Sequence, residues 1–150
     1  MPSPDPCQAA RRRHLRVRPG ARLDRPSAAI AVVDRAVAVP RRNETIALLL
    51  DHARHGVAIV SVAGTDHADD VVEVVELLTS PSAHHGRADA LVVASVWCDP
   101  PADRDDRPVV DRWLELHQIA ADCGVELLDW FELTDRVTSL RVEAGAPSRW

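Results

Sequence analysis

The chain of 150 residues is long enough for one domain with a sizeable core, and its 46% hydrophobic content is typical of a globular protein. Its three cysteines are an odd number without metal-ligand spacing, which argues against a disulfide framework and favours a reducing, cytoplasmic compartment. No apolar run reaches the ~18 residues of a membrane span, so no membrane segment is expected, and the net charge of −5 disfavours a general nucleic-acid surface.

Residues 1–27 are rich in proline and arginine, and they predict a disordered tail before a single domain over 28–150. The tail is basic, whereas the rest of the chain is acidic. Such an arm contacts nucleic acid or an acidic partner, or it is simply solvated. Nucleic-acid binding is therefore expected only through this tail, and the expected partner of the domain is another protein or a second copy of the chain.

The domain is expected to open with a helix over 28–39, although the same residues also fit a strand. Two apolar runs follow, Thr45–Asp51 and Val57–Ala63. The connection between them is too short for a crossover, so they predict an antiparallel hairpin. The next amphipathic segment, Val71–Leu78, predicts a helix.

The second half predicts a buried central strand, a long helix and two further strands. The strand Ala90–Val96 lacks polar alternation before its end, and the helix Val109–Cys123 is stopped by a glycine. The last strands are expected at Val125–Leu133 and Val137–Val142. The apolar face expected for the helix comprises Val110, Trp113, Leu114, His117 and Ala121. The fold class is thus α/β (α+β), a mixed β-sheet flanked by helices.

The end of the central strand is the candidate site, because strand ends of this kind normally carry the chemistry of such a fold. It holds Ser95, Trp97, Cys98 and Asp99, and Trp130 on the next strand is expected beside it. Indoles here indicate an apolar binding pocket or plain core packing, and core packing is preferred for the tryptophan of the long helix. Cys98 has no sequence signature of an activated nucleophile.

Several segments resemble those of the RadC-like branch of the JAB/MPN (JAMM) metalloprotease-fold superfamily. They are Glu44 before a strand ending in Leu-Asp, the Gly-Thr-ended strand 56–65, the strand 89–94, the Leu-Leu-Asp segment 123–130 and the Ser-Leu-Arg of 139–141. The resemblance covers residues 43–142. It implies a cytidine-deaminase-like architecture, with the element order hairpin, helix, strand, loop, helix, strand, strand.

Active members of this superfamily bind one zinc through a His-x-His pair at the strand end and an aspartate in the following loop, and a glutamate assists the bound water. In this chain the His-x-His positions fall on Ser95 and Trp97 or, with a shift of one residue, on Val96 and Cys98, and neither alignment supplies two ligands. The position of a further family histidine is occupied by Trp130. Only Glu44 matches a catalytic role, as a vestigial candidate. The resemblance therefore implies a non-catalytic binding or scaffold module with no cofactor.

Two alternatives remain open. One is a zinc-dependent peptidase or isopeptidase with displaced ligands, which requires three ligands around one point. The candidates for these ligands are His52, His55, His67, His84, His85, Cys98, Asp99 and Asp103. The other is a DNA-repair accessory protein that acts through the arginine-rich tail.

Overall fold

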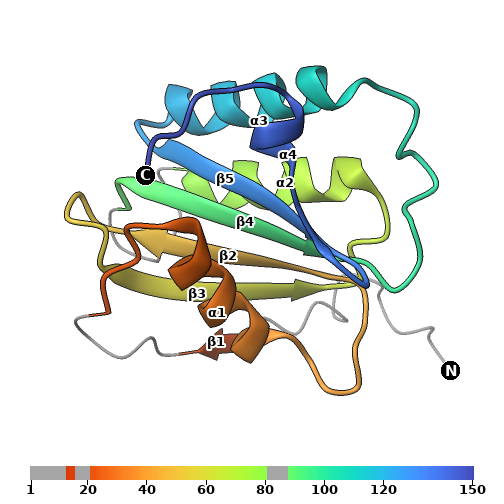
Figure 1. Cartoon of the computed structure of the whole chain (residues 1–150), viewed down its shortest axis with the longest axis horizontal. Helices are drawn as coiled ribbons and strands as arrows, with labels where there is room; N and C mark the ends of the chain where they lie inside the picture. Colours follow the sequence, from red (N-terminus) through yellow and green to blue (C-terminus); the bar gives the residue numbers. More distant parts are fainter. Residues whose placement is uncertain (1–12, 16–20, 81–87) are drawn as a thin grey trace, which may run out of the picture.

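The computed structural model describes residues 13–15, 21–80 and 88–150. A mixed six-stranded sheet in the order β1-β3-β2-β4-β5-β6 forms the middle layer, with α1 on one face and α2, α3 and α4 on the other (Figure 1). This arrangement confirms the predicted mixed sheet flanked by helices. The elements are β1 (Arg13–Leu15), α1 (Pro26–Ala36), β2 (Glu44–Leu50), β3 (Gly56–Ala63), α2 (Ala68–Thr79), β4 (Ala90–Val96), α3 (Val109–Asp122), β5 (Glu126–Leu133), β6 (Val137–Ser139) and α4 (Leu140–Glu143).

The hairpin expected from the two apolar runs is formed by β2 and β3, which pair antiparallel. Its turn is closed by Asp51, whose carboxylate accepts the backbone N–H groups of Ala53 and His55, both at 2.9 Å. Arg54 takes a positive φ of 67° in this turn. The aspartate thus supplies the hydrogen bonds that a tight turn needs.

β4 is the central strand, as predicted, and all seven of its residues are buried. It runs antiparallel to β2 and parallel to β5. Because side chains alternate along a strand, Leu91, Val93 and Ser95 face α2 and α3, while Val92 and Ala94 face α1. This alternation decides which candidate site residues can meet.

α3 has the predicted span to within one residue, but its predicted apolar face is only partly right. Val110 and Leu114 are 42% and 57% exposed, and Trp113 is buried in the core, as preferred from the sequence. The face turned to the core is therefore shifted from the predicted one and includes Arg112, which is buried. The Arg112 guanidinium donates to the Asp69 carboxylate of α2 at 2.9 Å. The buried residues of α3 are Arg112, Trp113, Leu116 and Ala120.

The last predicted strand, Val137–Val142, is wrong in its second half. β6 ends at Ser139, and the chain turns into the short helix α4. The Ser139 Oγ accepts the backbone N–H of Val142 at 3.2 Å, which caps this helix. A local cap therefore overrides the alternating pattern of these residues.

The boundary predicted for the disordered tail at residue 27 is too late. Leu23 is 3% exposed, and its N–H donates to the carbonyl of Arg54 at 2.7 Å. α1 begins at Pro26, and β1 pairs with β3. Residues 1–12 and 16–20, which hold the rest of the predicted tail, lie outside the described residues. Within the described ranges, no helix is long and apolar enough to cross a membrane.

Candidate functional site

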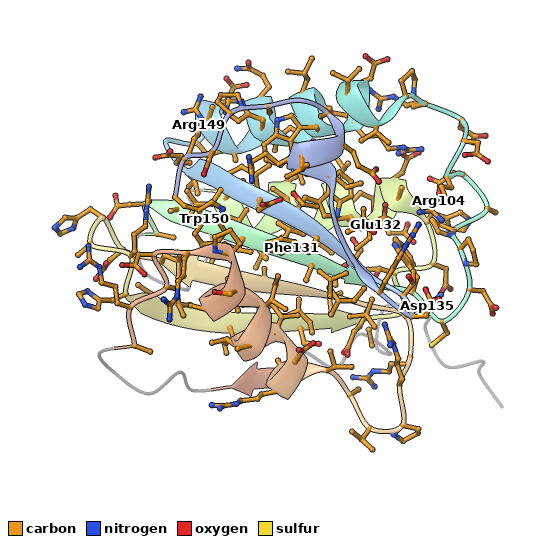
Figure 2. All side chains as sticks on the ribbon, in the orientation of Figure 1. Arg104, Phe131, Glu132, Asp135, Arg149 and Trp150 are labelled. Atoms are coloured by element: carbon orange, nitrogen blue, oxygen red, sulfur yellow. The ribbon has the colours of Figure 1, made fainter. Side chains whose placement is uncertain are left out.

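An open cleft of about 700 Å³ lies at the carboxyl ends of β4 and β5 and is called the carboxyl-end cleft below. Figure 2 shows Arg104, Glu132 and Asp135 at this end of the molecule, whereas Arg149 and Trp150 lie at the other end. Small-molecule sites have volumes in this range. The cleft lies between the loop after β4, the β5–β6 turn and the loop before β2; its lining includes Arg41, Trp97, Cys98, Arg104, Glu132 and Arg136.

The two candidate residues directly after β4 are held at the cleft by backbone hydrogen bonds. The N–H of Trp97 donates to the carbonyl of Leu133 at 2.9 Å, and the N–H of Cys98 donates to the Asn43 Oδ1 at 2.8 Å. Trp97 is only 2% exposed, so it belongs to the core and to the cleft wall at once. Cys98 is an exposed free thiol in the lining, whereas Asp99 is exposed but does not line the cleft.

Ser95 and Trp130 contact each other inside the core. The indole Nε1–H of Trp130 donates to the Ser95 Oγ at 2.8 Å, and both residues are fully buried. Ser95 does not line the cleft, and Trp130 lines only a small cavity behind it. Two of the three residues at positions that the resemblance assigns to histidines are therefore hydrogen-bonded to one another.

The inner cavity has a volume of about 50 Å³ and shares Trp97, Arg104 and Glu132 with the cleft. Two buried donors in its wall, the Trp97 Nε1 and the Arg112 Nε, have no hydrogen-bond partner among the described residues. Buried polar groups normally have a partner, so two unpaired donors at one cavity require an explanation.

Glu132 and Glu143 are the acidic residues of this wall, and the side chain of Glu132 is 12% exposed. Burial raises its pKa above the ordinary value, and the negative charge of Glu143 raises it further. Arg104, at 3.7 Å, the indole of Trp97 and the charge of Arg112 act in the opposite direction but do not cancel the effect. The carboxyl group therefore holds its proton more tightly than a solvated glutamate.

Asp103, a candidate metal ligand, is used to hold the cleft loop. Its carboxylate accepts the N–H groups of Ala68 and Asp69 at 2.8 and 3.2 Å, at the start of α2, and lies 3.7 Å from the Arg112 Nη2. Burial alone would raise the pKa of Asp103, but these donors outweigh it and the pKa is lowered. The loop after β4 is thereby tied to α2.

Glu44 lies on the opposite face of the sheet from Ser95 and Trp97. It pairs with Val96 on β4, and its buried carboxylate accepts the N–H of Ala38 at 2.7 Å and the Ser61 Oγ–H at 2.8 Å. Since neighbouring residues of a strand point to opposite faces, the glutamate does not share a site with the predicted ligand positions.

The candidate histidines among the described residues do not line the cleft. His52 and His55 lie in the β2–β3 turn, at the far end of the sheet, because the strand end before this turn pairs with the start of β4. His67 precedes α2, with its Nδ1 3.5 Å from Asp70. His84 and His85 lie outside the described residues. Within residues 21–80 and 88–150, no three His, Cys, Asp or Glu side chains are grouped to hold a metal ion.

The sequence interpretation missed the charged residues of the cleft, which are Arg41, Arg104, Glu132, Asp135 and Arg136. Each arginine comes from a different loop, and the chain contains eighteen basic residues, all arginine. In the sequence, the only feature that marks these three arginines is that each lies in a loop next to a strand end. Other arginines of the chain share this feature, so it does not identify the residues of the cleft.

No protein-family model and no curated protein matches the chain. The family resemblance therefore stays a prediction drawn from the residues themselves.

Proposed function

We propose that this chain is a binding module of RadC/JAB-like architecture that does not use the zinc chemistry of the active members, and that the carboxyl-end cleft is its ligand site. The observed order β2-β3-α2-β4-α3-β5-β6 supports the architecture, because it follows the order expected from the resemblance. The antiparallel hairpin and the central β4 lie where that order requires them.

A second observation supports a common framework. Asp129, of the Leu-Leu-Asp segment, accepts a hydrogen bond from the Ser139 Oγ at 2.7 Å and one from the Arg141 Nε at 3.1 Å. Serine and arginine both come from the Ser-Leu-Arg segment. Two segments that resemble the family separately in sequence are therefore in direct contact.

The observation that carries the proposal is the hydrogen bond between Trp130 and Ser95. An indole N–H is a donor only and offers no lone pair to a metal ion. Zinc at the family position would require this buried pair to separate, with loss of core packing. The cleft beside the pair stays open, so a binding role needs no such rearrangement.

Metal analysis of the purified full chain tests the proposal. After dialysis against metal-free buffer and addition of one equivalent of zinc followed by desalting, we expect far less than one zinc per chain by plasma mass spectrometry. Retention of one zinc per chain would overturn the proposal and favour the hydrolase with displaced ligands. Alanine variants of His67 and Cys98 would then identify whether the metal lies at the cleft end.

A further inference from the structure

Three arginines from three separate loops line the carboxyl-end cleft. Arg41 donates through its Nη2 to the carbonyl of Leu133 at 2.7 Å, and Arg104 lies 3.7 Å from Glu132. No hydrogen bond or ion pair joins the Arg136 guanidinium to any described residue. A guanidinium has five N–H donors and no acceptor, so this exposed group in the cleft lining has donors available for a ligand.

Unlike the Arg136 guanidinium, the carboxylates that line the cleft already have partners within the protein. The side chain of Glu132 is 12% exposed and its Oε1 lies 3.7 Å from the Arg104 guanidinium. Asp135 accepts the hydroxyl hydrogen of Thr134 at 3.0 Å. The Trp97 Nε1, in a residue that is 2% exposed, makes no hydrogen bond of ordinary geometry to a described residue, although the indole favours the charged form of Glu132. The cleft therefore has a surplus of donors, which is the pattern expected for a ligand rich in acceptors.

We infer that the cleft binds a small organic phosphate ester, with its phosphate group between Arg41, Arg104 and Arg136. This inference rests on the proposed binding function and specifies its ligand class. The planar fork of arginine matches pairs of phosphate oxygens, and the three arginines outnumber the two carboxylates of the lining, Glu132 and Asp135.

The size of the cleft favours an ester over a free phosphate ion. Its volume of about 700 Å³ leaves room for an organic group beside the phosphate. A second hollow of about 370 Å³ shares Arg41 and Arg136 with the cleft and is lined by Val37 and Val137. These apolar side chains provide a surface for the organic part of the ligand.

Cys98 allows the occupancy of the cleft to be measured without knowledge of the natural ligand. In a Cys7→Ser/Cys123→Ser background, it is the single thiol of the chain. Its alkylation rate would be measured with phenyl phosphate, inorganic phosphate or benzoate at constant ionic strength set with chloride. We expect phenyl phosphate to slow alkylation most, inorganic phosphate less, and benzoate and chloride little.

The arginine variants then locate the bound phosphate. Arg136→Gln is expected to raise the phenyl phosphate concentration needed for protection by about tenfold or more, since a hydrogen bond between charged groups is lost. Arg41→Gln provides a second test. Arg22→Gln is the matched control, because Arg22 is an exposed arginine whose backbone pairs with that of His55 at the far end of the sheet. It should leave protection unchanged.

Three results would overturn the inference: no protection by phenyl phosphate up to about 10 mM, equal protection by benzoate, or unchanged protection in both cleft variants. Circular dichroism melts would verify that each variant is folded. Zinc content measured on the same samples tests the proposed function separately. Absence of both protection and zinc would thus remove the ligand class but leave the proposed function standing.

Discussion

Two buried polar clusters adjoin β5, and they differ in how completely their hydrogen bonds are made. In the Asp129 cluster (Asp129, Ser139, Arg141), one carboxylate oxygen accepts the Ser139 hydroxyl and the Trp130 N–H, and the other accepts the Arg141 Nε–H. In the Glu132 cluster (Trp97, Arg104, Arg112, Glu132), two buried N–H groups make no hydrogen bond of ordinary geometry to the part of the chain that the structure describes.

The difference separates a structural cluster from a candidate binding cluster. A buried charge with all its hydrogen bonds made rigidifies the fold, and an unpaired buried donor lowers its stability. The Asp129 cluster is sealed by β6 and α4, while the Glu132 cluster borders the cleft. Unfilled donors next to an opening indicate that a ligand or water completes the set. The following substitutions would break or sharpen this contrast.

The largest effect is expected for Asp129→Ala. The substitution leaves the guanidinium of Arg141, which is 12% exposed, without its carboxylate partner. Removal of one partner from a buried ion pair typically lowers the free energy of unfolding by about 3–5 kcal/mol. Urea denaturation followed by circular dichroism would measure it. Ser139→Ala is the matched control and should cost only about 1 kcal/mol; equal losses would mean that the ion pair is not the main contribution.

A smaller effect is expected for Asp103→Asn, about 1 kcal/mol at pH 7, because the charge at the start of α2 is lost. The pKa of Asp103 is lowered from 3.8, so its stabilisation is present above that pH and is lost as the pH falls through the folded-state value. The difference between wild type and variant should therefore shrink in acid.

Unfolding free energies at pH 7 and at low pH would test this dependence. Asp105→Asn is the control, since Asp105 is exposed in the same loop. A loss of stability that is as large in acid as at pH 7 would contradict the role given to the Asp103 charge.

Glu132→Gln should change how the free energy of unfolding depends on pH more than it changes the magnitude of that free energy. The pKa of Glu132 is raised from 4.5, so the folded state holds this proton more tightly than the unfolded state. The contribution of Glu132 is present below pH 4.5 and is lost as the pH rises through the folded-state value. Relative to wild type, the glutamine variant should therefore gain stability between acid and neutral pH.

Thermal unfolding across this pH interval would measure the profile. Glu73→Gln, at an exposed position of α2, serves as the control. If both variants follow the same profile, the buried carboxyl group is not the origin of the effect.

The smallest effect on stability is expected for Arg136→Gln, within about 0.5 kcal/mol, because its guanidinium contacts no described residue through a hydrogen bond or ion pair. Chemical denaturation would test this expectation. A loss above 1 kcal/mol would assign Arg136 a structural role and would weaken the contrast between the two clusters.

Most elements were predictable because their signals are local. The apolar runs of β2, β3 and β4 and the glycine after α3 define these elements within a few residues. The face of α3 was not predictable, because burial of Arg112 depends on Asp69 and Asp103 from other segments. α4 was missed because the pattern around Ser139 alternates like a strand until its hydroxyl caps a helix.

The sequence alone thus determined the order of the main elements and placed Trp97 and Cys98 at the end of a central strand. Only the tertiary structure placed Glu44 on the other face and brought Arg41, Arg104 and Arg136 together around the cleft. The physical reason is that periodicity records which side of an element is apolar, while strand register and loop packing decide which distant side chains meet.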